Sequence, residues 1–161
     1  MRSISFDAII PENAKILILG TMPGIKSLEE HEYYAHDRNA FWPMMFAIFN
    51  NDFSIDYKTR ISLLKNKKIA LWDTLKLCYR EGSLDSNIKN AEPNEIIGFL
   101  ERNQTIKHVL FNGKGAEKYY EKFHDRIPGI NYYSMPSTSP ANARFKFEDK
   151  LNAWQIIKEL L

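Results

Sequence analysis

Cysteine is almost absent from this chain of 161 residues, because Cys78 is the only one. A single thiol excludes an internal disulfide and any metal site made only of cysteines within one chain. The four histidines, at positions 31, 36, 108 and 124, have neither i, i+4 spacing nor a cysteine close in sequence. Because metal-binding motifs rely on such spacings, we expect no metal site.

Long hydrophobic runs are also missing. No stretch of about 18 apolar residues occurs, and the opening segment MRSISFDAII lacks the apolar centre and cleavage site of a signal peptide. We therefore expect no membrane association and a cytoplasmic location, or a nuclear one in a eukaryote. Net charge is low as well, at +2, so any contact with nucleic acid must rely on local lysines and arginines and on neutral donors.

Three common catalytic and nucleotide-binding motifs are absent too. The segment GTMPG, residues 20–24, lacks the Gly-Lys-Ser/Thr ending of a phosphate-binding P-loop, and it does not follow the dinucleotide pattern G-x-G-x-x-G. No G-x-S-x-G elbow is present, which argues against a serine hydrolase of the α/β type.

What the chain does contain is an alternation of apolar strands and helical patterns. Four apolar runs occupy residues 15–20, 68–73, 107–113 and 130–136, and the first three are continuous, as in strands covered on both faces. Helical patterns occupy residues 40–50, 57–66, 92–103, 115–124 and 147–161. This order predicts an α/β fold, three-layer α/β/α with a central four-stranded parallel sheet, in a single domain spanning residues 1–161.

The carboxyl ends of the four predicted strands are rich in polar and turn-forming residues. They read GTMPG, WDTLKLCYR, FNGKG and MPSTSPANAR. Ligands of open parallel sheets bind at this edge, so the four segments predict one shared site. The segment behind the first strand, residues 21–40, is also far longer than the usual connection of about 2–6 residues, which favours a functional loop.

Four segments in order resemble the uracil-DNA glycosylase superfamily, and in particular its hypoxanthine-DNA (deoxyinosine) glycosylase branch. They are GTMPG with YYAHDRNAFW, then ALWDTLKLCYREGSLDSNI, FNGKGA and MPSTSPANA, spanning residues 15–145. The resemblance implies an enzyme that flips a deaminated base out of DNA and hydrolyses its N-glycosidic bond without a cofactor. Hypoxanthine is the first candidate base and uracil the second. DNA containing such a base is the implied partner, and no obligate protein partner is evident.

The resemblance places the catalytic role on Asn39. Many members of the superfamily carry an Asp or Asn in the first loop to position the attacking water, but Met22 occupies that place here. The hypoxanthine branch resembles this chain in using the Asn of its AH-x-RN-x-FW segment, which is Asn39. An amide has no useful basicity near neutral pH, so its role is to hold water. The alternative is that Asn39 only caps the helix that follows.

The paired tyrosines and His36 are candidates for contact with the base. The resemblance puts Tyr34 where related enzymes place an aromatic ring against the base, and Tyr33 is the alternative. Stacking on a base contributes about 1–3 kcal/mol. His36 is assigned to the base or the sugar, with orientation of the loop as its alternative role.

Two further groups are assigned to the base. The backbone of Gly20, Thr21 and Met22 offers N–H donors at short range. Asp73, at the end of the second strand, stands where better-known relatives place a base-reading Asn. A carboxylate only accepts, so it can take the N1–H of hypoxanthine or the N3–H of uracil, whereas adenine presents a lone pair there. The alternative is that Asp73 caps a following helix.

The last two segments supply further candidates for base and DNA contacts. Asn112 is assigned to the base, with a simple Asn-Gly turn as the alternative. The loop MPSTSPANA resembles the one that presses into the minor groove, with a plain surface turn as the alternative. Its DNA-binding candidates are Ser137, Thr138, Ser139, Ala141, Asn142 and Arg144. Ala141 and Asn142 fall at the wedge position and are small for it.

Local positive charge is expected from Arg38, Lys76, Arg80 and Arg144, which lie on or beside these loops. Two other classes of function compete with the glycosylase. One is a nucleic-acid-binding module of the same fold that has lost turnover, and the other is an unrelated α/β enzyme acting on nucleotides.

Overall fold

The computed structural model describes residues 1–161. Its strands are β1 (Arg2–Ile4), β2 (Ile16–Gly20), β3 (Ile69–Asp73), β4 (Leu75–Tyr79), β5 (Lys89–Pro93), β6 (His108–Asn112) and β7 (Asn131–Met135). Its helices are α1 (Ile25–Glu30), α2 (Phe41–Ile48), α3 (Tyr57–Asn66), α4 (Ile96–Arg102), α5 (Lys114–Phe123), α6 (Phe147–Trp154) and α7 (Ile156–Leu160), with a 3₁₀ turn, η1, at Asp85–Asn87. None of the helices combines the length and apolarity that a membrane span requires.

The main sheet has the predicted four parallel strands, in the order β3-β2-β6-β7. The register places Gly20 beside Asp73, and Asn112 beside Met135. Each of these residues ends its strand, so the four carboxyl ends meet at one edge, as predicted from the sequence. The fold class is thereby confirmed.

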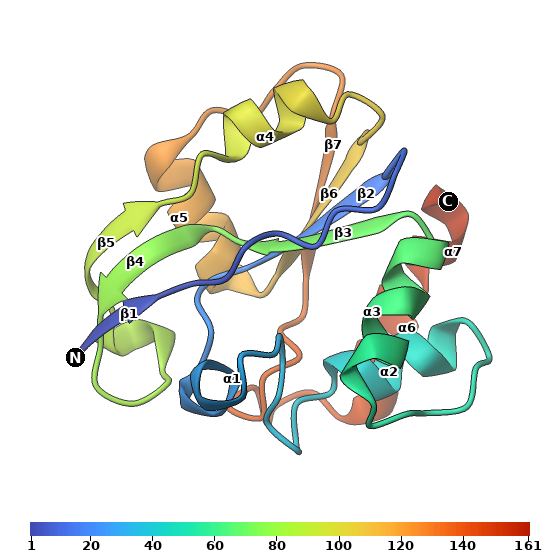
Figure 1. Cartoon of the computed structure of the whole chain (residues 1–161), viewed down its shortest axis with the longest axis horizontal. Coiled ribbons are helices and arrows are strands. Elements are labelled where there is room, and N and C mark those ends of the chain that lie inside the picture. The colour runs from blue at the N-terminus through green and yellow to red at the C-terminus, as the bar shows by residue number, and fades with distance from the viewer.

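Two hydrophobic cores lie on opposite faces of this sheet. Alternate residues of β2 separate between them, because successive strand side chains point to opposite faces. Ile16 and Ile18 pack with α2, α3, α6 and α7, while Leu17 and Leu19 pack with α4 and α5. The two groups of helices are seen on either side of the sheet in Figure 1. Burial on both faces explains why these strands are apolar without alternation.

A second, smaller sheet extends from one end of the main sheet and was not predicted. It contains β1, β4 and β5, all antiparallel. Only Thr74 separates β3 from β4, so one stretch of chain passes from the parallel sheet into the antiparallel one (Figure 1). Because the chain after Asp73 continues as strand β4, no helix begins at Thr74, and the capping alternative for Asp73 is wrong.

Two helix boundaries also differ from the prediction. The helix expected over residues 92–103 begins only at Ile96, because Lys89–Pro93 pairs with β4 as strand β5. The helix expected over residues 147–161 is divided into α6 and α7 at Gln155. Neither change moves the carboxyl edge of the main sheet.

Candidate active site

A single large cavity, of about 1240 Å³, opens at the carboxyl edge of the parallel sheet. Every residue predicted for the site lines it: Gly20, Thr21, Met22, Tyr34, His36, Asn39, Asp73, Asn112, Ser137, Thr138, Ser139, Ala141, Asn142 and Arg144. They come from all four strand ends and from the long segment that follows β2. The structure therefore brings the predicted residues together, while the role of each stays a prediction.

In the cavity, the side chains of Asp73 and Tyr34 lie close against the backbone of Gly20. A Cβ added at Gly20 would lie 2.5 Å from Asp73 Oδ1 and 2.8 Å from the Tyr34 hydroxyl. Both distances are shorter than van der Waals contact, so any larger residue at position 20 would displace the Asp73 carboxylate or the Tyr34 hydroxyl. The Asp73 carboxylate, from β3, and the Tyr34 hydroxyl, from the segment after α1, thus both lie beside the Cα of Gly20.

Asp73 is almost fully buried, with 3% of its surface exposed, and its Oδ2 has no hydrogen-bond partner. Burial raises the pKa of Asp73 to about 7, and the negative charge of Asp85 adds to the rise while Arg80 opposes it. An unpaired buried carboxylate is costly to a fold. The group is therefore available to a ligand that supplies a donor.

The two tyrosines have separate surroundings. Tyr33 is buried, donates its hydroxyl to the Asp7 carbonyl (2.8 Å), and is held through its backbone by Tyr57 and Trp42. The Tyr34 ring stacks on Phe41 at 4.2 Å between centroids, and its hydroxyl is enclosed without a partner. The Tyr34 backbone has a φ of 54°, an uncommon left-handed conformation for a bulky residue.

Asn39 lies one residue before Ala40, the N-cap residue of α2. Its Oδ1 accepts the N–H of Phe41 at 3.0 Å, where α2 begins, and the side chain also lines the cavity. Asn39 is therefore not the N-cap residue named in the alternative, although its side chain accepts the first N–H of the helix. This hydrogen bond does not exclude water binding, because an amide oxygen has two lone pairs. His36 is exposed and accepts the N–H of Arg38 through Nδ1, at 3.1 Å, so it also orders this loop.

The loop after β7 is fastened to the rest of the site by side-chain bonds. Asn112 donates through Nδ2 to the Thr138 hydroxyl (3.0 Å) and accepts the Thr138 N–H (2.9 Å). Thr138 is fully buried, and its carbonyl accepts the N–H of Ala40 at 2.9 Å. Trp154 and Lys150 hold the carbonyls of Pro136 and Ser139. Asn112 and Thr138 therefore join two walls of the cavity.

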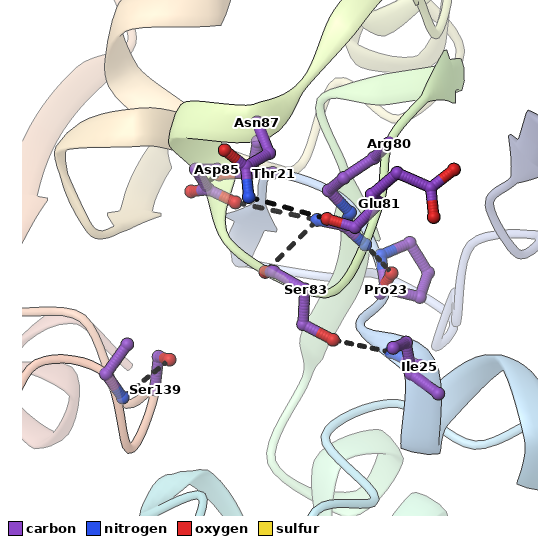
Figure 2. A network of polar contacts seen from close by, with 10 residues as sticks. Thr21, Pro23, Ile25, Arg80, Glu81, Ser83, Asp85, Asn87 and Ser139 are labelled. Atoms are coloured by element: carbon purple, nitrogen blue, oxygen red, sulfur yellow. Dashed lines mark hydrogen bonds and ion pairs between the residues drawn. The ribbon is translucent and has the colours of Figure 1, made fainter. Parts of the chain in front are cut away.

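A polar network ties the segment after β4 to the loop after β2 (Figure 2). Arg80 donates to the carbonyls of Pro23 and Ser83, and the Thr21 hydroxyl donates to Asp85 Oδ2 at 2.9 Å. The expected contribution of Arg80 to an exposed positive surface is thus wrong, because its side chain is only 1% exposed. Lys76 is exposed on β4 and does not line the cavity, whereas Arg144 does.

The comparison with known families agrees with this geometry. Residues 7–158 match the family described as the Uracil DNA glycosylase superfamily. The chain belongs to this superfamily. It is therefore a DNA glycosylase, which excludes the alternative of an unrelated nucleotide enzyme.

Two curated relatives of this glycosylase carry the name hypoxanthine DNA glycosylase. The protein from Methanosarcina barkeri is 37% identical over 155 residues, covering 96% of each chain. The one from Methanosarcina acetivorans is 34% identical over 155 residues, covering 94% of this chain and 95% of its own. A solution NMR structure of a candidate uracil DNA glycosylase from Methanosarcina acetivorans superposes with a TM-score of 0.82, at 31% identity, covering 98% of this chain and 99% of that one.

Three residues around the glycosylase cavity were missed or misassigned from sequence. Asp85 lies within a recognised segment, but nothing in its spacing indicates that it meets Thr21. Arg80 was expected at the surface, and only the fold shows its burial. Phe145 lines the cavity with 40% of its surface exposed. Its signal was present, since an aromatic residue between Arg144 and Lys146 is unusual in a solvated loop.

Proposed function

We propose that this glycosylase removes hypoxanthine from DNA containing deoxyinosine, with uracil as a weaker substrate, and leaves an abasic site for base-excision repair. The observation that carries the proposal is the buried, unpartnered Asp73 carboxylate at a cavity wide enough for a purine. The names of the two curated relatives support the same base.

Asp73 selects the base by its acceptor character. The ionised carboxylate takes the N1–H of hypoxanthine, whereas the lone pair at N1 of adenine is repelled. The backbone N–H groups of the Gly20–Gly24 loop are further donors within the same cavity. This pattern distinguishes the deaminated purine from its parent because deamination converts a ring acceptor into a donor.

Hydrolysis then needs a water molecule held at the sugar carbon. Asn39 supplies the second lone pair of Oδ1 and its free amide for this water, while the bond to Phe41 fixes the orientation of the side chain. Met22 packs with Leu75 and Cys78 and offers no hydrogen bond of comparable strength. Catalysis by Asn39 is thus positional, with charge developing on the sugar rather than on a nucleophile of the protein.

The base must first leave the DNA duplex to reach the cavity. Phe145 is the side chain best suited to fill the gap that the base leaves in the DNA stack. Ala141, at the wedge position expected from the resemblance, is too small to replace a base. Phe145 is large, exposed, and located at the same cavity mouth. Apolar side chains inserted between base steps stabilise kinked and flipped DNA. Arg144 and the hydroxyls of Ser137 and Ser139 would contact the adjacent phosphates.

The deciding experiment uses duplexes that carry one deoxyinosine, one deoxyuridine or one unmodified adenine. We expect alkali-labile sites to appear fastest with deoxyinosine, more slowly with deoxyuridine and not with adenine. Breakage should require alkali, and EDTA should leave the rate unchanged. Equal rates on deoxyinosine and adenine would contradict the role of Asp73, and absence of excision from all three would contradict the proposal as a whole.

A further inference from the structure

Arg80 is a buried cation at the start of the segment that joins β4 to β5. Its guanidinium donates to the Pro23 carbonyl and, at 3.3 Å, to the Ser83 carbonyl, and its Nη1 lies 3.8 Å from Asp85 Oδ1. A buried guanidinium needs such partners, since unpaired it would strongly destabilise the fold. Arg80 thereby links the loop after β2 to the segment after β4 (Figure 2).

Asp85 makes the second link between the same two segments. It accepts the Thr21 hydroxyl, and the Ser83 hydroxyl nearby accepts the N–H of Ile25 at 2.9 Å. Helix α5 closes this position from the other side: a Cβ at Gly115 would collide with Asp85 Oδ2 and lie 3.1 Å from Thr21 Oγ1. Asp85, Thr21 and Asp73 line the same cavity. Arg80 and Asp85 thus contact Pro23 and Thr21, in the same loop whose Gly20 lies against the Asp73 carboxylate.

We propose that Arg80 and Asp85 are positioning residues that hold the Gly20–Gly24 loop against the Asp73 carboxylate and that their two charges adjust the protonation of this buried group. The consequence for excision rests on the proposed function, whereas the effect on Asp73 itself does not. No contact between either residue and the base is required.

Few charged or titratable groups surround Asp73 and could change its protonation. They are Arg80 and Asp85 from β4 and the segment after it, Tyr33 and Tyr34 from the segment after α1, and Tyr57 from α3. Burial raises the pKa of all three tyrosines, so they stay neutral. Burial also raises the pKa of Asp85, but the Thr21 hydrogen bond and Arg80 oppose that rise. His36 lines the cavity as well and is exposed to solvent.

Because the two charges have opposite signs, removing them has opposite consequences. Arg80→Gln takes away a stabilising cation, so the pKa of Asp73 should rise above its present value of about 7. Asp85→Asn takes away a repelling anion, so the pKa of Asp73 should fall. General damage to the fold would not produce shifts of opposite direction.

The test is a carboxyl ¹³C NMR titration of Asp73 in the free enzyme, assigned by its loss in Asp73→Asn. We expect the midpoint to move up in Arg80→Gln, to move down in Asp85→Asn, and to return toward wild type in Arg80→Lys. Lys76→Gln and Glu81→Gln are matched controls, since each removes an exposed charge from the same region, and both should leave the midpoint unchanged. If Arg80→Gln fails to fold, the downward shift in Asp85→Asn remains decisive.

A second measurement compares single-turnover excision of deoxyinosine across the same pH range. We expect the acidic limb of each profile to move with the NMR midpoint of that variant. Midpoints that stay fixed, or that move in one direction in both variants, would overturn the inference whatever the activity. Midpoints that move as expected while the excision profiles do not would instead refute base reading by Asp73, and the inference would stand.

Discussion

At the scale of single residues, the site combines groups that are costly to the fold with groups that stabilise it. Asp73 belongs to the first kind, because it is a buried carboxylate with an unpaired oxygen. Asn39 belongs to the second, because it accepts the first N–H of α2. Each has one structural effect and one proposed catalytic effect, and the two effects are separable by substitution.

For Asn39, we expect the Ala variant to reduce single-turnover excision by on the order of 10²-fold, the usual effect of losing one preorganised contact. It should also lose about 1 kcal/mol of unfolding free energy, because the N–H of Phe41 loses its hydrogen-bond partner. Asn39→Ser keeps an oxygen that can accept this N–H but is too short to hold the same water.

The comparison of the Ala and Ser variants therefore separates the two roles of Asn39. Excision that recovers in Asn39→Ser along with stability would leave the hydrogen bond to Phe41 as its only function. Met22→Ala is the control within the same cavity, and it should reduce excision far less than Asn39→Ala.

For Asp73, the raised pKa predicts a pH-dependent stability. Between about pH 4 and 7 the folded state keeps the Asp73 proton, whereas the unfolded chain has released it. The stabilising contribution is therefore complete at low pH and is lost as the pH rises through 7. Asp73→Asn lacks this titration.

We thus expect the unfolding free energy of Asp73→Asn to improve relative to wild type by roughly 2–4 kcal/mol between pH 4.5 and pH 8. Urea denaturation at the two pH values measures the change. Glu81→Gln, which removes an exposed acid, should show no comparable difference. A constant offset between Asp73→Asn and wild type would mean that Asp73 titrates as an ordinary carboxylate.

At the scale of secondary-structure elements, the parallel sheet was predictable and the antiparallel one was not. Strands β2, β3 and β6 are apolar runs buried on both faces, so their sequences carry a strong signal. Strand β5 reads KNAEP and is mostly exposed, and β1 has three residues. Strand β4, LKLCY, follows β3 after a single residue, so the two read together as one polar-ended segment rather than as two strands.

The site likewise contains features that a local sequence pattern predicts and features that it does not. The residues of the cavity were predictable because each lies at a strand end or in a recognised segment. The pairing of Arg80 with Pro23 was not, since it joins backbone and side chain 57 positions apart. Contacts of this kind depend on how the two sheets are placed, which no local pattern encodes.

The junction between the loop after β7 and helix α6 provides an element-level prediction, because Phe145 lies in the loop and Phe147 is the first residue of α6. The two side chains have nearly equal exposure, 40% and 41%, but only Phe145 lines the cavity. We expect Phe145→Ala to slow excision from a base-paired deoxyinosine duplex by on the order of tenfold, since the cost of unstacking is no longer offset.

Excision from single-stranded DNA should be nearly unaffected in Phe145→Ala, because no base pair must be opened there. Phe147→Ala should leave both rates close to wild type. Equal slowing on single-stranded and double-stranded DNA would assign Phe145 a role in the cavity rather than in the DNA duplex. An effect confined to Phe147→Ala would refute the insertion of Phe145 into the duplex.

At the scale of the whole molecule, the low net charge of +2 limits how strongly DNA is held. The cations that line the cavity are Lys26, Lys114 and Arg144, and Lys26 is already paired with Glu30 at 3.1 Å. About two or three neutralised phosphates give a slope of roughly −2 to −3 in a plot of log affinity against log salt concentration.

Fluorescence anisotropy with a deoxyinosine duplex between 50 and 200 mM salt, using the slow Asn39→Ala variant, measures this slope. Arg144→Ala should make it shallower by about one unit. Lys76→Ala removes a cation from the exposed side of β4 and should not change it. A steep slope that neither substitution alters would place the main phosphate contacts on another face.

The single residue between β3 and β4 fixes which face of the small sheet each side chain of β4 occupies. Strand side chains alternate between faces, so a one-residue insertion after Thr74 would rotate all of β4 by half a turn. Leu75 and Leu77, now buried, would exchange places with the exposed Lys76, and Arg80 would point away from Pro23. The length of this junction is therefore as constrained as any side chain in the cavity, and relatives that differ in length are expected to place their insertions elsewhere.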